Sequence, residues 1–109
     1  MKVLVADDTV VNRQILQTLL RKDGHSVVLA ENGKQAVAQF ETEQPDLIIM
    51  DLMMPEMDGK EATSLIKQRS GARFVPVIFL TAVTDEKGLT ECLASGGDDV
   101  LTKPYRLPL

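Results

Sequence analysis

Residues 47–51 read LIIMD, four apolar side chains in succession closed by an aspartate. A short apolar run without polar alternation is typical of a strand buried on both faces of a sheet. Pro45 lies just before this run, and a loop containing Pro55 and Gly59 follows it. Comparable short runs recur elsewhere in the chain, at residues 2–6, 26–30, 77–81 and 99–102. We therefore expect five short strands, with the one at residues 47–51 in the centre of the sheet.

Apolar residues at helical spacing fill the segments between these runs. In the first segment the repeating apolar residues are Val11, Ile15, Leu16, Leu19 and Leu20. The later segments carry Ala36, Val37 and Phe40, then Ala62, Leu65 and Ile66, then Leu89, Cys92 and Leu93. Gly24 is placed to end the first helix, and Asn32 to cap the second.

Strands that alternate with amphipathic helices indicate an α/β fold, a parallel sheet covered on both faces. The expected architecture is a flavodoxin-like, doubly wound five-stranded sheet in the order 2-1-3-4-5, an order that periodicity alone does not fix. The length of 109 residues allows a single domain, residues 1–109. Residues 103–109 are too few for the helix that would cover the last edge. We therefore expect an N-terminal fragment of a longer protein, the alternative being another cover such as a dimer contact.

The composition excludes several classes of protein. The net charge is −4, from 12 basic and 16 acidic residues, which argues against direct binding of nucleic acid. A single cysteine, Cys92, excludes an internal disulfide and a cysteine-rich zinc site. The first apolar run stops at Asp7, far short of a signal peptide or a membrane span. We expect a protein without membrane association, located in the cytoplasm.

Polar residues follow four of the five expected strands. They are Asp7 and Asp8, then Asp51, Thr81 and Lys103. Carboxyl ends of parallel strands meet at one edge of the sheet, where such folds bind their ligands. Each pair of carboxylates about 4 Å apart costs roughly 1 kcal/mol in water and about 4 kcal/mol at an effective dielectric constant near 20. Lys103 and a divalent cation can balance these charges, and oxygen ligands suit Mg²⁺.

A carboxylate beside Mg²⁺ and a lysine suits phosphoryl chemistry. Asp51 is the best candidate nucleophile because it ends the central strand, and Thr81 can donate a hydrogen bond to a phosphoryl oxygen. Taken alone, Asp7 and Asp8 are equally well explained as the acidic start of a helix. The carboxylate, hydroxyl and ammonium at the other strand ends favour the metal site.

The sequence resembles the receiver domain of two-component response regulators over nearly its whole length. The residues that carry the resemblance lie in four segments, 3–8, 45–59, 76–82 and 97–104. The resemblance implies that Asp51 accepts phosphate, that Thr81 is the switch hydroxyl and that Lys103 pairs with the phosphoryl group. It implies Mg²⁺ bound by Asp8, Asp51 and the backbone carbonyl of Met53, with Asp7 acting through water. The backbone N–H groups of Met53 and Ala82 would contact the phosphoryl oxygens.

One residue departs from the pattern of the family that the sequence resembles, and two others bear on hydrolysis of the phosphoryl group. Val100 stands where the family usually has an aromatic residue three positions before the lysine. We expect switching to run through Thr81 and the following loop, without movement of a ring. Met53 and Val83 are apolar at positions where the family tunes hydrolysis, so we expect a long-lived phosphoryl group.

The expected function is a phosphoacceptor switch in a two-component phosphorelay, a regulatory domain that assists its own phosphorylation and is no metabolic enzyme. The expected partners are a histidine kinase or histidine phosphotransfer protein, docking near Val11 to Leu20, and an effector domain C-terminal to the chain or on another protein. A second copy of the chain could also bind. The alternative is a phospho-independent interaction module. A phosphohydrolase is less favoured, because Met53 replaces the expected second carboxylate, and no glycine-rich loop indicates nucleotide or flavin.

Overall fold

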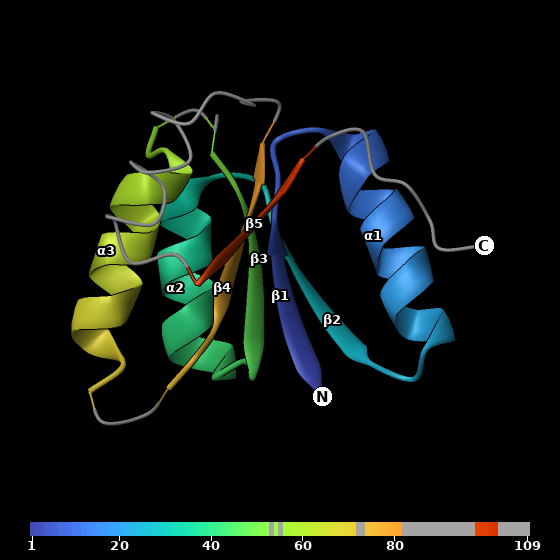
Figure 1. The fold of residues 1–109 in the computed structure, drawn as a ribbon, viewed down its shortest axis with the longest axis horizontal. Coiled ribbons are helices and arrows are strands. Elements are labelled where there is room, and N and C mark those ends of the chain that lie inside the picture. Colours follow the sequence, from blue (N-terminus) through green and yellow to red (C-terminus); the bar gives the residue numbers. More distant parts are fainter. Residues whose placement is uncertain (53, 55, 72–73, 82–97, 103–109) are drawn as a thin grey trace.

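The computed structural model of the chain describes residues 1–52, 54, 56–71, 74–81 and 98–102. Its strands are β1 (Lys2–Ala6), β2 (Ser26–Ala30), β3 (Leu47–Asp51), β4 (Val77–Thr81) and β5 (Asp99–Thr102). Its helices are α1 (Val10–Lys22), α2 (Gly33–Glu43) and α3 (Gly59–Arg69). The strands form one parallel sheet in the order β2-β1-β3-β4-β5 (Figure 1). This confirms the predicted topology; the helix expected around Leu89 to Leu93 lies outside the described residues.

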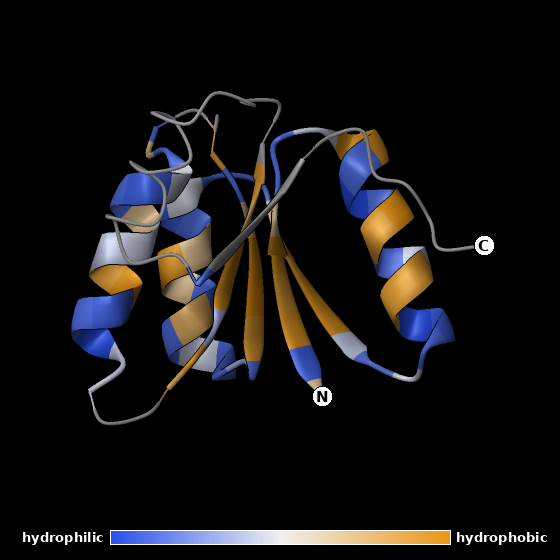
Figure 2. Ribbon diagram, viewed as in Figure 1, coloured by the Kyte–Doolittle hydropathy of each residue, from blue (hydrophilic) through white to orange (hydrophobic). Residues whose placement is uncertain are grey.

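Helices cover both faces of the sheet, α1 on one side and α2 and α3 on the other (Figure 1). Alternate residues of β1 therefore enter different cores. Leu4 and Ala6 belong to the cluster that includes residues of α2 and α3, whereas Val3 and Val5 belong to the cluster that includes Leu16 of α1. Strands β1 to β4 are hydrophobic along much of their length (Figure 2). Complete burial of a side chain the size of Leu4 contributes about 1.5–3 kcal/mol.

The residues expected at two helix ends, Asn32 and Gly24, are found there. The Asn32 side chain accepts a hydrogen bond from the backbone N–H of Gln35 at 2.8 Å, which caps α2. Gly24 has φ +89°, a conformation that favours glycine. Its N–H donates to the carbonyl of Arg21, and the next N–H donates to that of Leu20. These two bonds form a Schellman motif, which ends α1 where the sequence predicted.

The residues that α1 buries are not the same as its apolar residues. Leu16 is buried, but Val11 and Ile15 are 60% and 40% exposed. Arg13 is buried instead, three residues before Leu16 and on the same side of the helix. The apolar arc of α1 is wider than the surface that the sheet covers. Part of it is therefore exposed.

Asp98 precedes β5 and connects it to β4 and α3 through hydrogen bonds. Its carboxylate accepts hydrogen bonds from the backbone N–H of Val77 at 2.7 Å and from Lys67 Nζ at 2.8 Å. Lys67 also donates to the carbonyl of Val75. Desolvation raises the pKa of Asp98, but the hydrogen bonds from Lys67 and Val77 outweigh it and lower the pKa below its usual value.

Candidate metal centre

Three adjacent strands bring predicted site residues, Asp7, Asp51 and Thr81, to one edge of the sheet. Asp7 directly follows β1, and Asp51 is the last residue of β3, which pairs with β1. On the other side of β3, Asp51 is paired with Leu80, and Thr81 ends β4 one residue later. The parallel register therefore places these strand ends next to one another, as the sequence predicted.

The carboxylates of Asp7, Asp8 and Asp51 form a cluster at this edge. One oxygen from each of the three lies within 4.8 Å of the others. Asp7 is fully buried and Asp51 is 3% exposed, whereas Asp8 is exposed. An octahedral Mg²⁺ with bonds of about 2.0–2.1 Å separates its ligand oxygens by about 3–4 Å. The three carboxylates thus offer the donor type that suits Mg²⁺, gathered closely enough that they could hold a metal ion, and two of them are shielded from bulk water.

Backbone contacts fix the turn that carries the two aspartates. The Asp7 N–H donates to the carbonyl of Ala30 at 3.1 Å, which ties the turn to β2. The Thr9 N–H donates to Asp7 Oδ1 at 2.9 Å, and its hydroxyl lies 3.5 Å from Asp8 Oδ1. Thr9 is the N-cap residue of α1, so both aspartates precede the helix. The bond to Asp7 therefore orders the turn and does not cap an N–H inside the helix.

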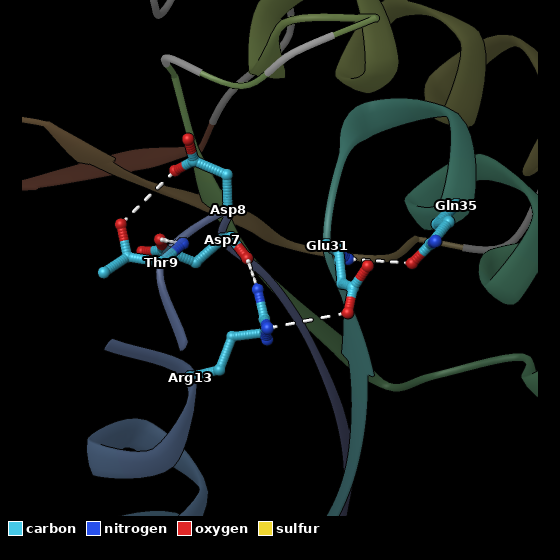
Figure 3. Close-up of polar contacts among 6 residues, drawn as sticks. All are labelled: Asp7, Asp8, Thr9, Arg13, Glu31 and Gln35. Carbon is cyan, nitrogen blue, oxygen red and sulfur yellow. Dashed lines mark hydrogen bonds and ion pairs between the residues drawn. The ribbon is translucent and has the colours of Figure 1, made fainter. Parts of the chain in front are cut away.

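Arg13 is a residue of this region that sequence reasoning missed. Its Nη1 donates to the carbonyl oxygen of Asp7 at 2.7 Å, and its Nη2 lies 3.6 Å from Glu31 Oε1 (Figure 3). The signal was present in the sequence. Arg13 is three residues before Leu16 and seven before Leu20, on the same side of an amphipathic helix. A long cation at such a position indicates a buried polar partner.

Two glycines let the loop after Asp51 pack closely against its surroundings. A Cβ at Gly59 would lie 2.2 Å from the carbonyl oxygen of Asp51, and one at Gly33 would lie 2.2 Å from that of Met57. The Gly59 N–H donates to the Leu52 carbonyl, and the Gly33 N–H to the Met57 carbonyl. Glycine is thus required at both positions because a backbone carbonyl lies close to the Cα, and not because the backbone has an unusual φ. The loop is held at the end of β3 and at the start of α2.

The other predicted site residues are only partly described. Thr81 ends β4, and its backbone pairs with Thr102, the last residue of β5. Lys103 follows Thr102 directly in the sequence. Lys103, Met53 and Ala82 lie outside the described residues, and their roles stay predictions.

No helix among the described residues is long and apolar enough to cross a membrane.

Comparisons with known proteins point to one family. The family model for the response regulator receiver domain matches residues 3–108. The chain is 38% identical over 104 residues to the alkaline phosphatase synthesis transcriptional regulatory protein PhoP of Bacillus subtilis (strain 168). That match covers 95% of this chain and 42% of the relative, so the chain spans less than half of that protein.

Solved structures give the same result. The chemotaxis protein CheY4 of Vibrio cholerae superposes with a TM-score of 0.90 at 33% identity, covering 96% of this chain and 88% of that one. The receiver domain of Ssk1 from Saccharomyces cerevisiae, crystallised with the histidine phosphotransfer signaling protein Ypd1, gives a TM-score of 0.89 at 35% identity. That match covers 97% of this chain and 80% of the other.

Proposed function

The chain belongs to the response regulator receiver domain family, whose members are regulatory signalling domains, and on that premise we propose that it is an Mg²⁺-dependent phosphoacceptor switch. The observation that carries this proposal is the carboxylate cluster of Asp7, Asp8 and Asp51 at the carboxyl ends of β1 and β3. Its oxygen donors fit Mg²⁺, and Asp51 in the cluster is the nucleophile. The proposed metal ligands are Asp8, Asp51 and the Met53 carbonyl, with Asp7 acting through water.

The reaction is a transfer from a phosphohistidine to Asp51. A carboxylate oxygen of Asp51 forms a bond to phosphorus while the bond from phosphorus to the donor imidazole nitrogen breaks. The electron pair of that bond stays on the imidazole, which takes a proton from solvent. The bound metal supplies positive charge against the phosphoryl oxygens. Burial of Asp51 to 3% exposure keeps bulk water away from the reacting carboxylate.

The remaining residues of the proposed site act on the phosphoryl group after transfer. Lys103 pairs with it, and the backbone N–H groups of Met53 and Ala82 donate to its oxygens. The Thr81 hydroxyl donates a further hydrogen bond, which draws the end of β4 toward the phosphorylated Asp51. This movement is the proposed switch, and it needs no aromatic ring at the position of Val100.

The proposed partner on the input side is a helical protein that carries the phosphohistidine, a histidine kinase or a phosphotransfer protein. Val10, Val11 and Ile15 of α1 are 54%, 60% and 40% exposed, and the helix begins two residues after Asp8. An apolar surface next to the acceptor site suits docking of a helix pair. The Ssk1 receiver domain, which this chain resembles, was crystallised with such a phosphotransfer protein. On the output side we propose an effector domain, on this polypeptide or on a partner.

The test is phosphorylation by acetyl phosphate with and without Mg²⁺, followed by intact mass spectrometry. We expect the mass of one phosphoryl group to be added to the wild type only with Mg²⁺, and no addition to Asp51→Asn. The matched control is Asp23→Asn, which removes an exposed carboxylate at the far end of α1 and should be phosphorylated like the wild type. A folded wild type that gains no phosphoryl group would favour the alternative, a phospho-independent interaction module.

A further inference from the structure

We propose that Arg13 is a positioning residue for the metal site, because it holds the peptide between Asp7 and Asp8 in the geometry that presents both carboxylates to the cation. This inference rests on the proposed function and adds to it a residue outside the acidic cluster. Figure 3 shows the arrangement: the Arg13 side chain extends from α1 toward Asp7, with Glu31 on its other side.

Arg13 is buried, and its strongest contact is to the backbone. The side chain is only 11% exposed, and Nη1 lies 2.7 Å from the carbonyl oxygen of Asp7. The contact to Glu31 is weaker, because its atoms are 3.6 Å apart and the Glu31 side chain is 64% exposed. A buried guanidinium is costly unless it is well bonded. The position is therefore better explained by the carbonyl of Asp7 than by the ion pair.

The carbonyl that Arg13 binds belongs to the peptide group that joins Asp7 to Asp8. Rotation of this peptide would change the direction in which both side chains leave the backbone. The same turn is held on one side by the Asp7 N–H, which donates to Ala30, and on the other by the Thr9 N–H, which donates to Asp7 Oδ1. Arg13 supplies the contact to the carbonyl between them. The orientation of the turn is thus fixed by three hydrogen bonds, one to β2, one from α1 and one within the turn.

The charge of Arg13 and its positioning role have opposite effects on metal affinity. A positive charge near a cation site repels the cation, so removing it would tighten the binding of Mg²⁺. Loss of positioning would weaken the binding, as removal of groups that orient metal ligands commonly does by about 10–100-fold. The direction of the change in Mg²⁺ affinity therefore separates the two roles. A role in folding alone would leave the Mg²⁺ affinity of the folded protein unchanged.

The experiment is calorimetric titration of the protein with Mg²⁺ alone, with folding checked by circular dichroism and urea denaturation. We expect Arg13→Met to bind Mg²⁺ about tenfold more weakly than the wild type. The matched control, Arg21→Met, removes an exposed arginine from the same helix and should bind like the wild type. Equal or tighter binding by folded Arg13→Met would overturn the proposal.

Arg13→Lys keeps the test decisive if Arg13→Met fails to fold. Lysine retains the charge but offers a flexible point donor in place of the planar fork. Several-fold weaker Mg²⁺ binding at unchanged charge would support positioning, and wild-type binding would overturn it. A folded wild type that binds no Mg²⁺ would refute the proposed function and this inference together. Normal binding by the wild type and by the Arg13 variants would refute the inference alone.

Discussion

Replacement of Gly59 by alanine should destabilise the domain, although helix propensity alone predicts the reverse. Gly59 is the first residue of α3, and alanine is favoured over glycine in helices, by about 0.5–1 kcal/mol in the interior and by no more than that at the first residue. The added Cβ, however, would lie 2.2 Å from the carbonyl oxygen of Asp51, whereas ordinary contact begins near 3.4 Å. The next nearest atoms, Asp51 C and Leu52 Cα, are also backbone atoms. No side-chain rotation can relieve the contact, so β3 and α3 must separate.

The size of this effect follows from the two opposing contributions. Overpacking of a well-packed region costs about 1–3 kcal/mol, so a net loss of about 1–2 kcal/mol is expected after the gain in helix propensity. With a denaturant slope of about 1–2 kcal/mol per M for a domain of this size, the urea midpoint should fall by about 1 M. Displacement of the Asp51 backbone should also slow phosphorylation by acetyl phosphate.

The assay is urea denaturation of Gly59→Ala, with Gly71→Ala as the matched control. A Cβ at Gly71 meets nothing within 4 Å, and its φ of +61° costs only the backbone strain of about 1 kcal/mol. We therefore expect Gly71→Ala to be phosphorylated at the wild-type rate, unlike Gly59→Ala. A urea midpoint of Gly59→Ala at or above that of the wild type would refute the reasoning from close approach.

Three further predictions concern other parts of the chain. The hydrogen bonds of Asp98 should contribute about 1 kcal/mol. This stabilisation should be fully present above the unfolded pKa near 4 and should be lost as the pH falls through the lowered folded pKa, so the urea midpoints of the wild type and Asp98→Asn should differ at pH 6 and approach each other as the pH is lowered below 4. Asn32→Ala should lower the free energy of unfolding by about 1 kcal/mol, because it removes the cap of α2, and thermal denaturation would show no change if the bond contributes nothing. The aspartyl phosphate should persist for minutes or longer in time-resolved mass spectrometry, because apolar Met53 and Val83 cannot orient a water molecule, and loss within seconds would contradict this explanation.

Much of the fold could be predicted from the sequence because short apolar runs indicate the strands. Residues 47–51 and the matching runs gave all five strands, and the alternation with helices gave a parallel sheet. The faces of α1 could not be predicted in the same way. Its apolar residues form an arc wider than the sheet can cover, so hydrophobicity alone did not show that Val11 would be exposed. Burial at that position is decided by tertiary packing.

The acidic residues of the candidate site could be predicted from the sequence. The contacts that hold those residues in place could not. Asp7 and Asp51 follow apolar strands, and the parallel register brings such positions to the same edge. The sequence places Arg13 on the buried side of α1, but it does not show that its partner is the Asp7 carbonyl, because a backbone carbonyl carries no residue signature. The need for glycine at positions 33 and 59 likewise depends on the distance to the backbone of another element. Such contacts become visible only when the elements are placed in space.

The most direct test of the central claim locates the phosphoryl group on the chain. After reaction with acetyl phosphate and Mg²⁺, reduction with borohydride converts an aspartyl phosphate to homoserine, which peptide mass spectrometry can assign to a position. We predict conversion at Asp51, the proposed nucleophile, and none at Asp7 or Asp8, whose only proposed role is to hold the metal. Conversion at another carboxylate, or none in a folded protein, would contradict the assignment of Asp51 as the phosphoacceptor.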